Sequence, residues 1–148
     1  MKIYSVYGLV LCCIFLGANI FCNPADSPRV YLADLTCGGT IPSSITAGQT
    51  FDIVIDVFNI EADADGTLDA GSSDLCIEIF RMDDTSGAWI KVTELVRPVA
   101  EIKAGTRRNL TVPMVINSPG NYRFDFFADA TNRVDERDES NNTDRLER

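Results

Sequence analysis

A run of acidic side chains between residues 59 and 74 has the residue types and the spacing of a cation site. The run reads Glu61-x-Asp63-x-Asp65-Gly66-x-x-Asp69. Ca²⁺ prefers about six to eight oxygen ligands, and carboxylates at alternate positions before a glycine can converge on one ion. A standard EF-hand would have a glutamate where Ser72 stands. The spacing predicts calcium binding by Glu61, Asp63, Asp65 and Asp69, and the alternative is an acidic turn exposed to water.

The composition argues against catalysis. The sequence contains no histidine, which removes Ser-His and Cys-His nucleophilic pairs and imidazole metal sites. Carboxylates are numerous, but they fall in predicted solvated loops, where burial would not raise the pKa of an acid catalyst. The sequence also lacks a glycine-rich phosphate loop. We therefore expect no enzymatic activity, no catalytic residues and no cofactor other than the candidate calcium ion.

The amino-terminal residues have the pattern of an export signal. Lys2 supplies a basic start, and residues 6–21 are almost continuously apolar but too short for a comfortable membrane span. We expect a signal peptide over residues 1–22, a short polar leader over 23–29 and one domain over 30–148. The product is then secreted, periplasmic or at the cell surface. Cys22 follows the apolar segment, so lipid anchoring there is the alternative to cleavage and release.

Two cysteines remain once the signal is removed. Cys37 and Cys76 form an even pair in an exported domain, which favours a disulfide. The apolar residues Leu75, Ile77 and Ile79 alternate with Cys76, however. This alternation places Cys76 on the less buried face of its strand, so a Cys37–Cys76 bridge would be peripheral.

The chain is strongly acidic. Its net charge is −9, and loss of Lys2 with the signal lowers it to −10. This negative charge repels nucleic acid and anionic membranes, so nucleic acid is not an expected partner. A membrane is expected only if Cys22 is lipidated. Cations and basic surfaces suit this charge better, and the alternative is an acidic surface that keeps an exported protein soluble.

Period-2 alternation dominates the chain. Phe51, Ile53, Ile55 and Val57 alternate with more polar residues, as in a strand with one face in a core. Gly38-Gly39 is expected to end the strand before it. The predicted strands cover residues 30–37, 51–57, 75–82, 89–96, 110–114, 122–126 and 143–146. Because no segment has a helical period, we predict an all-β sandwich of about seven antiparallel strands.

Three segments carry a family resemblance. They are Asp34-Leu35 with the run Ile41–Thr50, the strand Ile53–Asn59, and Ala128-Asp-x-x-Asn-x-Val-x-Glu-x-x-Glu-x-Asn-Asn-Thr143. In this order they resemble the CARDB domain, a cell-adhesion-related module of bacteria. The resemblance implies an immunoglobulin-like sandwich that is exported and binds a partner without catalysis.

The expected function is an exported binding or adhesion module. The loop after the second strand and the loop before the last strand emerge at one end of such a sandwich, forming an acidic pole that could face a protein or a carbohydrate. Asn59, Asn141 and Asn142 are expected to tie these loops through hydrogen bonds from their side chains to the backbone. The alternatives are a calcium-stabilised spacer domain and an accessory domain of a hydrolase.

Overall fold

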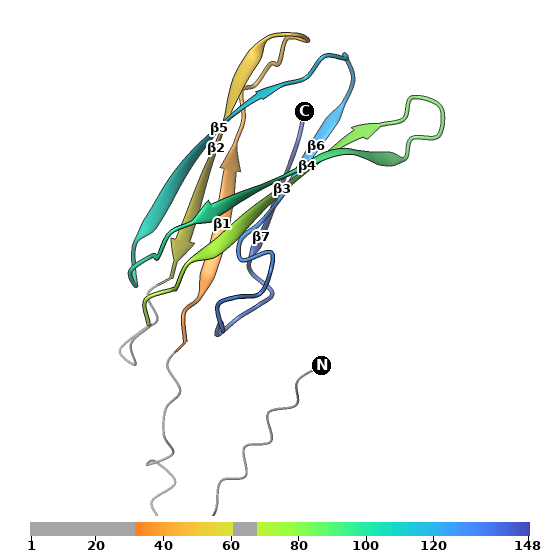
Figure 1. Ribbon diagram of the computed structural model, residues 1–148. Coiled ribbons are helices and arrows are strands. Elements are labelled where there is room, and N and C mark those ends of the chain that lie inside the picture. The colour runs from red at the N-terminus through yellow and green to blue at the C-terminus, as the bar shows by residue number, and fades with distance from the viewer. Residues whose placement is uncertain (1–31, 61–67) are drawn as a thin grey trace, which may run out of the picture.

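The computed structural model describes residues 32–60 and 68–148, and these form two antiparallel sheets packed face to face (Figure 1). One sheet has the strand order β1-β2-β5 and the other β4-β3-β6-β7. The strands are β1 (Leu35–Thr40), β2 (Thr50–Asn59), β3 (Ser73–Met82), β4 (Trp89–Val99), β5 (Arg107–Val115), β6 (Tyr122–Phe127) and β7 (Thr143–Glu147). The predicted all-β sandwich of seven antiparallel strands is therefore confirmed.

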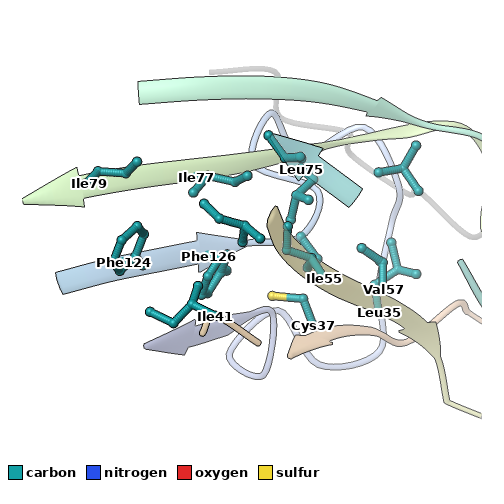
Figure 2. Packing of buried hydrophobic residues seen from close by; sticks show 14 of the residues in the cluster. Leu35, Cys37, Ile41, Ile55, Val57, Leu75, Ile77, Ile79, Phe124 and Phe126 are labelled. Atoms are coloured by element: carbon teal, nitrogen blue, oxygen red, sulfur yellow. The ribbon is translucent and has the colours of Figure 1, made fainter. Parts of the chain in front are cut away.

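The core lies between the sheets and follows the alternation in the sequence. Ile53, Ile55 and Val57 of β2 are fully buried. They face the opposite sheet, where Phe124 and Phe126 of β6 are also fully buried (Figure 2). Burying a side chain of this size stabilises a fold by roughly 1.5–3 kcal/mol relative to exposure. The aromatic strand β6 is thus a central contributor to the core.

The two lateral sides of the sandwich differ. On one side β1 of the first sheet lies against β7 of the second, and the Gly39 N–H donates to Asp144 Oδ2 at 2.8 Å. On the other side β4 and β5 are the outer strands of their sheets. In the described part of the chain, no strand pairs with the free edge of either β4 or β5. The sandwich is closed along β1 and β7 and open along β4 and β5.

Most strand boundaries differ from the prediction by one to five residues, the largest difference being that β1 begins at Leu35 and not at residue 30. Two of the differences have a clear physical reason. Gly38 and Gly39 do not end the first strand, because β1 runs through both to Thr40. A Cβ on Gly39 would lie 2.3 Å from the Phe126 ring, so this glycine allows close packing and makes no turn. β4 continues through Pro98 to Val99, which an edge strand tolerates because no neighbour needs the missing N–H.

Several predicted features lie outside the described residues. They are the signal peptide over 1–22, the leader over 23–29, the lipidation candidate Cys22, and the acidic residues Glu61, Asp63 and Asp65. Within residues 32–60 and 68–148, no helix has the length and apolar character needed to cross a membrane.

Candidate functional site: the loop pole

Residues 128–142 connect β6 to β7 and cover one end of the sandwich, where they contact residues 33–37 and Asp74. Asn59 joins them through its bond to Asp34. We call this assembly the loop pole. Its chain reversal depends on two left-handed residues, Asp129 (φ 44°) and Asn132 (φ 52°). Asp and Asn are the non-glycine residues that best tolerate this conformation. Asp129 also accepts hydrogen bonds from the N–H groups of Asn132 and Val134, both at 2.8 Å.

Glu136 joins this loop to the start of the chain's first strand. Its Oε2 accepts the Leu35 N–H at 2.5 Å, and its Oε1 accepts the Asn142 side-chain amide at 3.0 Å. The Arg137 N–H donates to the Ala33 carbonyl at 2.8 Å, and Ala33 and Glu136 form a parallel bridge. The Glu136 side chain therefore takes the place of a neighbouring strand at Leu35, the first residue of β1.

The environment of Glu136 opposes ionisation. Its side chain is buried, and desolvation is the main cause that raises its pKa to about 7. The nearby carboxylates of Glu139 and Asp129 raise this pKa further, whereas hydrogen bonds from Leu35 and Asn142 lower it. Glu136 thus changes its protonation near neutral pH.

Asn59 holds the other side of the pole. It is fully buried, and its Oδ1 accepts the Asp34 N–H at 3.1 Å. Its amide nitrogen donates to the carbonyls of Leu68 and Ile102, at 2.9 and 3.1 Å. The predicted loop-tying role of Asn59 is confirmed, because one side chain joins three backbone segments.

Asn141 and Asn142 complete the attachment to β1. Asn141 donates to Asp34 Oδ1 at 2.7 Å, and its carbonyl accepts the Thr36 hydroxyl at 2.9 Å. The Asn142 carbonyl accepts the Cys37 thiol at 3.3 Å. Their side chains bond to the side chains of Asp34 and Glu136, and not to the backbone as the sequence predicted.

Buried and exposed positions are separated along the loop. Asp129, Val134, Glu136 and Asn142 are buried. The residues between them are exposed, and the charged ones are Arg133, Asp135, Arg137, Asp138 and Glu139. The buried positions fix the backbone, so the intervening charged side chains project from a well-anchored loop.

The acidic run after β2 reaches the described structure only at Asp69. Its carboxylate accepts hydrogen bonds from Lys103 Nζ at 2.7 Å and from the Ala104 N–H at 3.0 Å. These two contacts, the Lys103 bond first, lower the pKa of Asp69. The described geometry gives Asp69 a structural role next to the β4–β5 connection. Within the described ranges, no group of three or more Cys, Asp or Glu side chains is arranged to hold a metal.

Cys37 and Cys76 are both free thiols, so the expected Cys37–Cys76 disulfide is absent from this structure. Cys37 lies among the core residues on β1 (Figure 2), whereas Cys76 lies on β3 of the other sheet. Cys76 lines a shallow depression with Glu78 and Val96 on the outer face, as the alternation predicted. Burial is the main cause that raises the pKa of both thiols, that of Cys37 to about 11, so neither is a reactive thiolate.

Sequence reasoning missed the inward positions of Asp34 and Glu136. The sequence assigned no structural role to the Asp34 side chain and placed Glu136 in an exposed acidic loop, yet both are buried and hydrogen-bonded. A signal was present for Glu136, because Val134 two residues earlier must face the core and alternate residues of an extended segment share a face.

The sequence between β1 and β7 also matches a family model. The match covers residues 32–145, which is most of the chain, and the model is that of CARDB. The chain belongs to the CARDB family. A CARDB domain is a cell-adhesion-related, immunoglobulin-like module that is itself non-catalytic, although it occurs within enzymes.

Two solved structures illustrate the range of proteins with this fold. The CARDB domain of the PF1109 protein from Pyrococcus furiosus, in complex with di-metal ions, has a TM-score of 0.62 at 19% identity, covering 80% of this chain and 94% of that chain. A β-glucosidase from Listeria innocua, in complex with isofagomine, has a TM-score of 0.53 at 14% identity, covering 78% of this chain but 16% of that chain. At these identities the similarity shows the fold alone. No curated protein matches the sequence.

Proposed function

We propose that this CARDB domain is an exported, non-enzymatic binding or adhesion module whose loop pole contacts a protein or a carbohydrate. The observation that carries the proposal is the separation of roles within residues 128–142. Buried side chains hold the loop to β1, and charged side chains between them face outward. A loop fixed before binding loses less conformational entropy when it binds, so its contacts yield more affinity.

The charges on the pole favour polar partners. Asp135, Asp138 and Glu139 are exposed beside Arg133 and Arg137. This mixture suits hydrogen bonding to sugar hydroxyls or to a polar protein surface. Arg133 also pairs with Asp74 at 3.0 Å, so part of the exposed charge is held in a defined position.

A matched pair of charge reversals tests the proposal. Asp135→Arg changes an exposed carboxylate on the loop pole, and Asp52→Arg makes the same change on β2, away from that pole. The purified protein would be tested on a glycan array and for adherence to cell surfaces. We expect Asp135→Arg to weaken binding and Asp52→Arg to leave it unchanged. A blank array together with no adherence by the unaltered protein would contradict the proposal.

An accessory role beside a hydrolase is a second candidate. The similar domain in the Listeria innocua β-glucosidase forms only part of a much larger chain. If this chain works in the same way, its loop pole would place a catalytic polypeptide near a carbohydrate. Binding of glycans on the array without adherence to cells would favour this second candidate.

A further inference from the structure

The open side of the sandwich differs in charge from the rest of the chain. β4 and β5 carry four basic residues, Lys91, Arg97, Arg107 and Arg108, against one acidic residue, Glu94. The two strands have a formal charge of +3, whereas the whole chain has −9. Lys91 is paired with Glu78 and Glu94, and Arg107 with Asp56, so among the described residues Arg97 and Arg108 are the cations of this side without a carboxylate partner. An acidic partner segment is attracted to this side and repelled by most of the remaining surface.

The same side exposes apolar surface. Ile90 and Val92 of β4 are each 51% exposed, and Val115 of β5 is 42% exposed. A cleft of about 260 Å³ lies between the two strands and is lined by Val92, Met114 and Val115, with Ile79 among the other lining residues. Apolar side chains grouped around a cleft at the sheet edges are a feature of interaction sites.

One cation in this cleft has an unused donor. Arg81 lines the cleft, and within the described residues its Nε–H is buried without a hydrogen-bond partner. Its guanidinium packs against Gly120, where a Cβ would lie 2.8 Å from Nε, so the side chain is held in place. Its ion pair with Asp84 is long, at 3.5 Å, and Asp84 is 75% exposed. Gly120 covers the Nε–H, but the Arg81 side chain as a whole is 38% exposed. A carboxylate from a partner could therefore accept from the terminal N–H groups of Arg81 in a charge-assisted hydrogen bond.

The edge of β4 supplies backbone groups for pairing. β4 is hydrogen-bonded to β3 alone among the described strands, so its outer N–H and C=O groups are free to bind an added strand. The register shift between Ile79 and Phe80 leaves Val92 as the extra residue of a bulge, beside the cleft. Pro98 has no N–H, which limits the pairing to the part of β4 before it.

From these features we propose that an extended, acidic segment of a partner protein adds as a strand to β4, with an apolar side chain in the cleft and a carboxylate on Arg81. This site is separate from the loop pole and does not depend on the function proposed for it. The partner segment is acidic because Arg81, Arg97 and Arg108 lack a close carboxylate partner among the described residues. It is extended because it pairs with the free edge of a strand.

Three peptides test the proposal by NMR titration of the purified protein. The probe TVEVEVT alternates apolar and acidic residues, TVKVKVT reverses its charge, and TVEPEVT interrupts its strand pairing. We expect TVEVEVT to shift the amide signals of residues 90–97 and 114–116 and the other two peptides to bind much more weakly. We expect Arg81→Gln to weaken TVEVEVT binding about tenfold or more, because a charge-assisted bond is lost.

Arg137→Gln is the matched control, since it removes an exposed guanidinium at the loop pole. It should leave TVEVEVT binding unchanged. The proposal is overturned if TVKVKVT or TVEPEVT binds as tightly as TVEVEVT, or if Arg81→Gln and Arg137→Gln have equal effects. The proposal is also overturned if a second copy of this chain already occupies β4. Sedimentation of the free protein would then show a dimer, and adding TVEVEVT would not dissociate it.

Discussion

The closed side of the sandwich, with the adjoining loop pole, and the open side between β4 and β5 use their residues in opposite ways. At the closed side and the pole, polar side chains are buried and hydrogen-bonded across long sequence separations, as Glu136 is to Leu35. At the open side, Ile90 and Val92 are exposed, and the outer edge of β4 pairs with no strand among the described residues. The contrast teaches that the first region stabilises the fold, whereas the second has unused surface available for binding.

The largest effect is expected in the core that both regions share. Phe126→Ala removes a fully buried ring that packs on Gly39 of β1, and we expect a loss of about 3–5 kcal/mol in the free energy of unfolding. Chemical denaturation followed by fluorescence measures this loss. A loss below about 1 kcal/mol would mean that β1 and β6 are not packed as described.

A comparison of two asparagines tests the contribution of the loop pole. Asn59→Ala leaves the Asp34 N–H and two carbonyls without their partner in a buried site, so we expect a loss of roughly 2–4 kcal/mol. Asn109→Ala, the control, removes only an exposed bond to Asp56, and should change stability by less than about 0.5 kcal/mol. Equal effects of the two substitutions in denaturation would remove the distinction between the two regions.

Protonation of Glu136 makes stability depend on pH. Its pKa is about 7 in the folded state against the ordinary value of 4.5 for a glutamate, so the folded state binds this proton more tightly. The resulting stability is fully present below about pH 4.5 and is lost as the pH rises through about 7. Glu136→Gln keeps an uncharged side chain and should remove this slope, and Glu147→Gln at an exposed position should not. Melting temperatures across this pH range would contradict the account if unaltered protein and Glu136→Gln showed the same slope.

The smallest effect is expected at the open side. Val92→Thr replaces an exposed methyl group beside the cleft with a hydroxyl, so stability should change by less than about 0.5 kcal/mol. The same substitution should weaken binding of TVEVEVT in the NMR titration. A destabilisation comparable to that of Asn59→Ala would show that Val92 belongs to the core.

The strands were predictable because their residues repeat with a period of two. The alternating residues Ile53, Ile55 and Val57 predict a strand with one buried face, and the turn residues on both sides indicate where the strand ends. The packing role of Gly39 was not predictable, because it depends on contact with the Phe126 ring, which belongs to a strand far away in the sequence. Nearby sequence alone favours a turn at a glycine pair.

The loop pole was predictable in composition but not in detail. The positions of Asn59, Asn141 and Asn142 were sufficient to expect loop-tying hydrogen bonds. The inward orientation of Asp34 and Glu136 depends on donors from other segments, the Asn141 side-chain amide for Asp34 and the Leu35 N–H for Glu136. The alternation of Val134 and Glu136 indicates which way Glu136 points, but no local sequence signal identifies the distant donors that these carboxylates meet.

Native-state hydrogen exchange tests the contrast between the two regions most directly. The amides of Asp34 and Leu35 donate to Asn59 and Glu136, so we predict that they exchange only through global unfolding of the domain. The outward-facing amides of β4 lack a partner strand among the described residues, and we predict that they exchange rapidly. Exchange of the Asp34 and Leu35 amides as fast as that of the β4 edge would contradict the account.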